Sequence, residues 1–199
     1  MPKRKHLLFV CLILSVVFSA CDQAYTPKPR GYFQINFPER KYKTFDAPGY
    51  PYTFEYPEYA QIIKDTSFFG DKPENPYWIN IDFPSLNGKI YLSYKIIGQG
   101  QNNLRKLIDD AFKMTYKHTY KADYIDENAI ATPNNVYGTF YAVGGNAASA
   151  RQFFVTDSSK HFLRGALYFD ATPNADSLAP VNKFLEQDMR KLVESLRWR

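Results

Sequence analysis

Histidine and serine are the residue types in this chain that could form a metal site or a catalytic pair. Beyond the first twenty residues the histidines are His118 and His161, and no H-x-x-x-H, C-x-x-C or H-E-x-x-H spacing occurs. We therefore expect no metal site. Ser158 and Ser159 come close to His161 in the sequence, but they read as a short polar turn and no G-x-S-x-G motif accompanies them. The pattern predicts no catalytic residue and no cofactor.

Two other motifs have plain structural interpretations. The stretch "GGNAAS" at 144–149 is rich in glycine, but it lacks the G-K-[ST] ending of a phosphate-binding loop, so we expect a hairpin turn. Asp109 and Asp110 are adjacent and diverge by about 100° around a helix, which indicates a solvated face. We therefore expect a protein that is not an enzyme, and a cell-wall enzyme is the weakest alternative.

The two cysteines lie in the N-terminal part of the chain, where the sequence has a different kind of signal. Basic "PKRK" precedes twelve mostly apolar residues, 7–18, which rise about 18 Å as a helix against a hydrocarbon core of roughly 30 Å. This predicts a signal peptide. The following "FSAC" resembles a bacterial lipobox, although Phe18 stands where leucine is preferred. The resemblance implies cleavage between Ala20 and Cys21, acylation of Cys21, and anchoring to a membrane.

This interpretation divides the chain into a removed signal peptide (1–20), a tether (21–31) and one globular domain (32–199). Pro27 and Pro29 stiffen the tether, and about ten residues reach at most about 35 Å. We expect the domain to work close to the membrane in the cell envelope, on the outer membrane and facing the periplasm. Asp22 keeps the inner membrane as an alternative.

The charge of the chain argues against a nucleic-acid partner. The formal net charge is +5, but three of the 25 basic residues (Lys3, Arg4 and Lys5) belong to the signal peptide. The remaining 22 basic residues face 20 acidic ones. A domain so nearly balanced lacks the basic surface that a phosphate backbone requires.

Short alternating strands separated by turns predict an α+β fold with a mostly antiparallel sheet of six or more strands packed against helices. We expect strands at 31–38, 52–56, 60–65, 77–84, 88–98, 122–127, 135–145, 150–157 and 161–171. Helical spacing indicates a helix from Asn102 or Asn103 to about 120 and a closing helix at 177–198 with Pro180 in its first turn. The opening F-x-[YF]-P strand, the central helix and the closing "SL-x-W" resemble Mog1/PsbP-like domains.

The most specific resemblance is carried by the lipobox, by "YTPKPRGYF-x-I-x-FP" and "YPYTFEYP", and by the C-terminal "SLRW". Together they resemble the GldD family, gliding-motility lipoproteins of the Bacteroidota. The resemblance implies a lipid-anchored envelope component that is required for gliding and is tied to the type IX secretion system and its other Gld lipoproteins. Only Cys21 transfers as a functional residue.

The segment 25–57 is dense in tyrosine, phenylalanine and proline, and it has two interpretations. Its aromatic side chains form core and edge strands, or they form a surface for a protein partner near the membrane, with Arg30, Tyr32 and Phe33 as candidate contacts. Assembly through such a surface is our first functional hypothesis. A lipid or glycan ligand held on an aromatic-lined sheet is the second.

Overall fold

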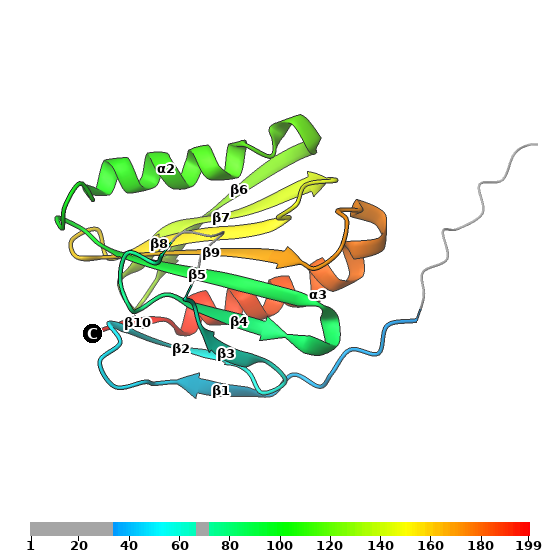
Figure 1. Ribbon diagram of the computed structural model, residues 1–199, viewed down its shortest axis with the longest axis horizontal. Coiled ribbons are helices and arrows are strands. Elements are labelled where there is room, and N and C mark those ends of the chain that lie inside the picture. Colours follow the sequence, from blue (N-terminus) through cyan, green and yellow to red (C-terminus); the bar gives the residue numbers. More distant parts are fainter. Residues whose placement is uncertain (1–33, 67–71) are drawn as a thin grey trace, which may run out of the picture. The chain divides into compact units, whose positions relative to one another are not determined.

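A seven-stranded antiparallel sheet forms the centre of the molecule, and its strand order is β3-β4-β5-β9-β8-β7-β6 (Figure 1). The computed structural model describes residues 34–66 and 72–199. The strands are β3 (Gln61–Lys64), β4 (Ile79–Phe83), β5 (Gly88–Ile96), β6 (Ala122–Thr132), β7 (Val136–Gly145), β8 (Arg151–Thr156) and β9 (His161–Phe169). β9 is buried along seven of its nine residues, because both faces of the sheet are covered there. The edge strand β6 is mostly exposed.

A second, three-stranded sheet has the order β1-β2-β10. It consists of β1 (Tyr42–Phe45), β2 (Tyr52–Pro57) and β10 (Arg197–Trp198). β2 lies between the other two strands, and both of them pair with it in antiparallel register. Two segments from opposite ends of the chain therefore meet on one strand.

Two α-helices are described, α2 (Leu104–Tyr116) and α3 (Ala175–Ser195), together with the short 3-10 helices η1 (Pro84–Leu86) and η2 (Thr119–Lys121). Asparagine caps the N-terminus of both α-helices. Asn103 Oδ1 accepts the Lys106 N–H at 2.8 Å, and Asn174 Oδ1 accepts the Ser177 N–H at 3.0 Å. Such caps satisfy N–H groups that have no partner within the helix.

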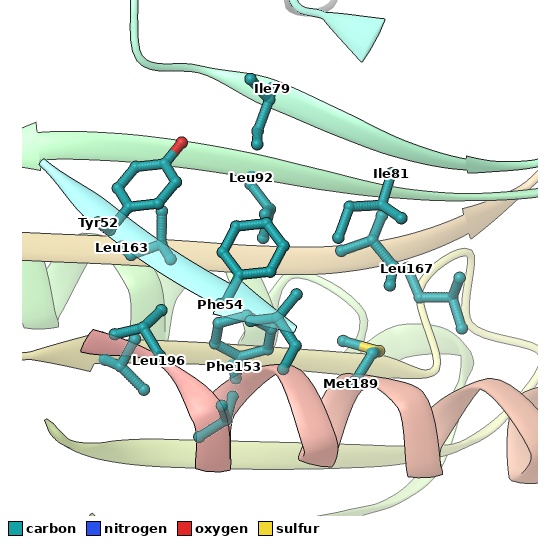
Figure 2. Close-up of a cluster of buried hydrophobic side chains, with 14 of the residues drawn as sticks. Tyr52, Phe54, Ile79, Ile81, Leu92, Phe153, Leu163, Leu167, Met189 and Leu196 are labelled. Atoms are coloured by element: carbon teal, nitrogen blue, oxygen red, sulfur yellow. The ribbon is translucent and has the colours of Figure 1, made fainter. Parts of the chain in front are cut away.

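The main core lies on the face of the large sheet that α3 and β2 cover (Figure 1). Alternation along β5 and β9 directs their apolar side chains to this face, where they meet β2 and α3. Figure 2 shows these side chains interlocked: Tyr52, Phe54, Ile79, Ile81, Leu92, Phe153, Leu163, Leu167, Met189 and Leu196. The β2 side chains Tyr52 and Phe54 are fully buried in this packing.

The opposite face of the large sheet carries α2 and a smaller apolar cluster. Leu107 and Ala111 of α2 pack there on Tyr141, Phe154 and Phe162. This face also holds buried polar side chains, among them Gln152 and Arg164. The two faces are therefore different in chemistry, one apolar and one mixed.

The expected α+β fold with a mostly antiparallel sheet is confirmed, as are the cap at Asn103 and the turn at 144–149 between β7 and β8. Two expectations are wrong. Residues 34–38, the described part of the strand expected at 31–38, form no strand, and the first strand begins at Tyr42. Pro180 is not in the first turn of α3, because the Asn174 cap starts that helix at Ala175.

Candidate functional site

Every functional residue that the sequence singled out lies in the N-terminal part of the chain. Cys21, Ala20, Arg30, Tyr32 and Phe33 are all outside the described residues. The described chain begins directly after them at Gln34, so the site is built from what the next residues contact. From Ile35 onward the chain forms one compact unit.

The carboxylate of Asp188 on α3 contacts side chains from the N-terminal part of the described chain. Asp188 is 2% exposed, and its two oxygens accept hydrogen bonds from two tyrosines. The Tyr42 hydroxyl of β1 donates to Oδ1 at 2.7 Å, and the Tyr59 hydroxyl, in the turn after β2, donates to Oδ2. Arg40 Nε lies 3.4 Å from Asp188 Oδ1. This is within ion-pair distance but does not form a hydrogen bond, so the contact is mainly electrostatic.

Arg40 and Phe37 also contact Phe184 of the same helix. The Arg40 guanidinium lies 4.0 Å from the centre of the Phe184 ring, and its Nη2 donates to the Phe184 carbonyl at 2.9 Å. The Phe37 ring stacks on the Phe184 ring with centroids 4.3 Å apart. Arginine over an aromatic face gains cation–π attraction in addition to its hydrogen bond. We call Arg40, Tyr42, Tyr59, Phe184 and Asp188 the Asp188 cluster.

The charges and hydrogen bonds of the Asp188 cluster stabilise the contact between the segment before β1 and α3. Burial raises the pKa of the Tyr42 hydroxyl, and the hydrogen bond to Asp188 raises it further; the same causes act in the same order on Tyr59. Both hydroxyls therefore remain protonated donors at neutral pH. A buried carboxylate with two hydroxyl donors and a nearby guanidinium is compensated, which is the condition for burying a charge. The arrangement holds the segment before β1 against α3.

The residues with catalytic side chains are occupied elsewhere. The Ser159 hydroxyl donates to Asp157 Oδ2 at 2.9 Å within the β8–β9 turn, as the polar-turn interpretation requires. His161 is buried, its Nδ1 lies 2.6 Å from the Tyr94 hydroxyl, and its ring stacks on Trp198. Burial lowers the pKa of His161, so the ring is neutral at neutral pH. Ser159 and His161 thus have separate partners.

The described residues contain neither a cluster of metal-ligating side chains nor a helix that could span a membrane. Within residues 34–66 and 72–199, no group of three or more His, Cys, Asp or Glu side chains is placed to hold a metal ion. No helix in the same part of the chain has the length and apolar character that crossing a membrane requires.

Sequence reasoning missed Asp188, although a signal was present. Asp188 lies three residues after Leu185 and four before Leu192, which places it on the buried face of α3. A carboxylate in an apolar helical stripe needs a donor, and the aromatic segment at 25–57 contains tyrosines. Nothing in the sequence indicated which tyrosines these are, because Tyr42 and Asp188 are 146 residues apart.

Comparison with known proteins decides the family. The model of the family described as "Gliding motility lipoprotein GldD" matches residues 22–198. The chain belongs to this GldD lipoprotein family. The Asp188 cluster therefore lies in the domain of a gliding motility lipoprotein, between its N-terminal segment and its closing helix.

One solved structure and one negative result complete the comparisons. The solution structure of cyanobacterial PsbP (CyanoP) from Synechocystis sp. PCC 6803 aligns over 86% of this chain and 98% of its own, with 12% identity and a TM-score of 0.45. No curated protein matches the chain.

Proposed function

We propose that this GldD-family chain is an acylated lipoprotein of the cell envelope that supports gliding motility and the associated type IX secretion machinery by docking to partner proteins. Membership of the GldD family supports the role in gliding. Acylation at Cys21 after cleavage behind Ala20, and the outer-membrane position facing the periplasm, are parts of the proposal. The inner membrane is the alternative position.

The Asp188 cluster is the observation that carries the docking role. A tethered domain that works by diffusion needs no contact between its fold and the segment leading to the anchor. Here that segment is held at Phe37, Arg40 and Tyr42 against one helix. The chain before β1 is thereby fixed to the domain as far as Phe37, which suits a component with a fixed place in an assembly.

The burial of the aromatic side chains counts against the alternative of a ligand held on an aromatic-lined sheet. Within the described residues, Tyr52, Phe54 and Tyr94 are each at most 1% exposed and pack on one another. They fill the space between the two sheets. The partner surface that we propose comprises Arg30, Tyr32 and Phe33 of the aromatic segment, which precede the described residues.

The first experiment separates anchoring from folding by using the two cysteines. In the native host we expect Cys21→Ala to move the protein out of the membrane fraction and to abolish colony spreading. Cys11→Ala is the matched control, because it changes the other cysteine and leaves the lipobox intact. Normal spreading by a protein that is no longer in the membrane fraction would sink the proposal.

The second experiment tests docking while anchoring is kept. We expect the triple variant Arg30→Ala, Tyr32→Ala and Phe33→Ala to remain in the membrane fraction, to lose crosslinks to other envelope proteins and to stop spreading. The control is Tyr120→Ala, which removes a tyrosine that is 81% exposed on η2. Unchanged crosslinks in the triple variant contradict the proposed partner surface.

A further inference from the structure

A buried arginine lies beneath α2, on the face of the large sheet that the docking proposal does not use. Arg164 is in the central strand β9 and is 6% exposed. Its neighbours across the sheet are Ser93 of β5 and Phe154 of β8. A guanidinium at such a place loses most of its hydration, and this loss costs free energy unless a counter-charge compensates it.

The contacts of Arg164 are with neutral groups. Its Nη2 donates to Gln152 Oε1 at 2.5 Å, and the Tyr168 hydroxyl is a second hydrogen-bond partner. Gln152 is itself fixed, because its Nε2 donates to the Ser149 carbonyl at 3.3 Å. Within the described residues, no carboxylate forms an ion pair with Arg164. The arginine is held in position without being neutralised.

Burial lowers the pKa of the Arg164 guanidinium, and the neighbouring tyrosine hydroxyls raise it by less. The group nevertheless stays charged, because arginine does not lose its proton in proteins. The positive charge at this position is therefore permanent and only partly compensated by dipoles.

Arg164 lines a cavity of about 300 Å³ between α2, β5 and β9, which we call the Arg164 pocket. The full lining is Ser93, Lys95, Leu107, Asp110, Ala111, Lys113, Met114, Lys117, Phe162 and Arg164. Four of these side chains are cationic and one, Asp110, is a carboxylate. Lys95 is paired with Glu74 at 2.5 Å, whereas Lys113 and Lys117 form no ion pair within residues 34–66 and 72–199. The pocket has an excess of positive charge.

The remaining wall of the Arg164 pocket is apolar, with Leu107, Ala111, Met114 and Phe162 facing the same space. Its volume is at the lower end of the range for small-molecule sites. An ion with no apolar part would leave this wall wet, and an apolar molecule would leave Arg164 without a counter-charge. The lining fits a molecule that has both parts.

We propose that the Arg164 pocket binds a small amphiphilic oxyanion, a phosphate or carboxylate group on a short apolar body. Arg164 contacts the oxyanion through its planar fork, which matches two oxygens at once. Lys113 of α2 and Lys117, directly after that helix, add positive charge to the lining, and Phe162 and Met114 contact the apolar body. Gln152 is a positioning residue that orients Arg164 through its side-chain oxygen.

Phenyl phosphate is the probe for the test, because it combines a phosphate with one apolar ring. With the full chain in detergent, we expect calorimetry to show saturable binding of phenyl phosphate, at least about tenfold tighter than that of neutral benzyl alcohol. Inorganic phosphate alone should bind more weakly than phenyl phosphate. Failure of the wild-type chain to bind phenyl phosphate, or equal binding of benzyl alcohol, overturns the proposal.

Two variants test the arginine, one by removing its charge and one by pairing it. Arg164→Gln should weaken phenyl phosphate binding by about tenfold or more. Gln152→Glu keeps the shape of the side chain but gives Arg164 a permanent carboxylate partner, so it should weaken binding by a similar factor while the fold is retained. Gln152→Glu keeps the buried Arg164 side chain, so it still tests the proposal if Arg164→Gln fails to fold.

The matched control is Arg105→Gln, which removes one positive charge from the exposed part of α2 outside the pocket lining. It should bind phenyl phosphate within about twofold of wild type, whereas Lys113→Gln combined with Lys117→Gln should bind several-fold more weakly. If Gln152→Glu binds like wild type, or Arg105→Gln loses as much affinity as Arg164→Gln, the pocket is not the site.

A vesicle experiment distinguishes a lipid headgroup from a free metabolite as the natural source of the oxyanion. The full chain with Cys21→Ala is used, so that acylation at Cys21 cannot contribute to vesicle binding. If Gln152→Glu lowers its binding to phosphatidylglycerol vesicles relative to phosphatidylcholine vesicles, the headgroup is the source. If only phenyl phosphate binding falls, the ligand is a soluble molecule.

Discussion

At the scale of single residues, buried charge distinguishes the two faces of the large sheet. Asp188 on α3 is surrounded by donors from the N-terminal segment. Arg164 on β9 is surrounded by neutral oxygen atoms and opens on a cavity. The first charge is satisfied within the chain and is therefore structural. The second is compensated, in our proposal, by a bound anion. This difference leads to separate predictions.

Replacing Asp188 with alanine should lower the free energy of unfolding by about 2–4 kcal/mol, because two buried tyrosine hydroxyls and Arg40 lose their acceptor. Urea denaturation measures this loss. Limited proteolysis should also show faster cleavage near Arg40. Asp188→Asn, which keeps one acceptor oxygen, is the control and should lose less. A fully stable Asp188→Ala protein would show that the Asp188 cluster does not fasten the segment.

Asp157 gives a prediction for acid conditions. Partial burial raises its pKa, but N–H groups of His161, Lys160 and Ser159 that donate to the carboxylate outweigh this and lower the pKa from 3.8 to about 2. Since the folded-state pKa lies below the unfolded-state value, the stabilisation is fully present above about pH 4 and is lost as the pH falls towards 2. Asp157→Asn should therefore be destabilised by about 1 kcal/mol at pH 7 and by almost nothing at pH 2.

Urea midpoints of wild type and Asp157→Asn at the two pH values check this expectation. A difference that stays constant with pH would contradict it, because the effect would then come from packing and not from the charge. Ser159→Ala is a suitable control, since it removes one hydroxyl donor to the carboxylate and leaves the three backbone donors in place.

At the scale of elements, the strongest constraint is the close pairing of β7 with β8. A Cβ atom on Gly138 would lie 1.9 Å from the carbonyl oxygen of Phe154, which belongs to the neighbouring strand and cannot rotate away. Gly138→Ala should therefore cost about 1–3 kcal/mol of stability, as other overpacked sites do. Thermal denaturation measures this. Gly98→Ala, where a Cβ would meet nothing within 4 Å but φ is +85°, separates backbone strain from collision.

Local patterns predicted the elements well where the pattern was regular and one face was buried. The alternation of β5 and β9, the Asn103 cap and the meander β7-β8-β9 all follow from side-chain spacing. The segment 34–38 also alternates, but it forms no strand, and its Phe37 ring stacks instead on Phe184 of α3. Tertiary contacts of this kind overrule a local period.

The buried charges were harder to predict, although each interrupts an apolar pattern. Arg164 stands within "HFLRGALYF" and Asp188 within the stripe of α3. The sequence indicates that such a residue needs a partner. The identity of the partner depends on sheet register for Arg164, which meets Gln152, and on a contact across 146 residues for Asp188, which meets Tyr42. β10 was missed for the same reason, since Arg197–Trp198 is too short to show a period and exists only by pairing with β2.

At the scale of the whole molecule, the two sheets share one core, so they should unfold together. The two tryptophans report on them separately. Trp78 directly precedes β4 in the large sheet, and Trp198 lies in β10 of the small one. We expect Trp78→Phe and Trp198→Phe proteins, each followed by its remaining tryptophan, to give the same urea dependence as circular dichroism once corrected for the stability of each variant. Two separated transitions would show independent units.

The position of β2 between β1 and β10 has a mechanical consequence. A pull on the N-terminal end of the domain would reach Phe37 and Arg40, and through them α3, before it reached the first hydrogen bond of β1. Because α3 leads directly into β10, the load would divide between a helix and both edges of one strand. The hydrogen bonds between β1 and β2 would then share the tension with the rest of the fold, and they would not break one after another.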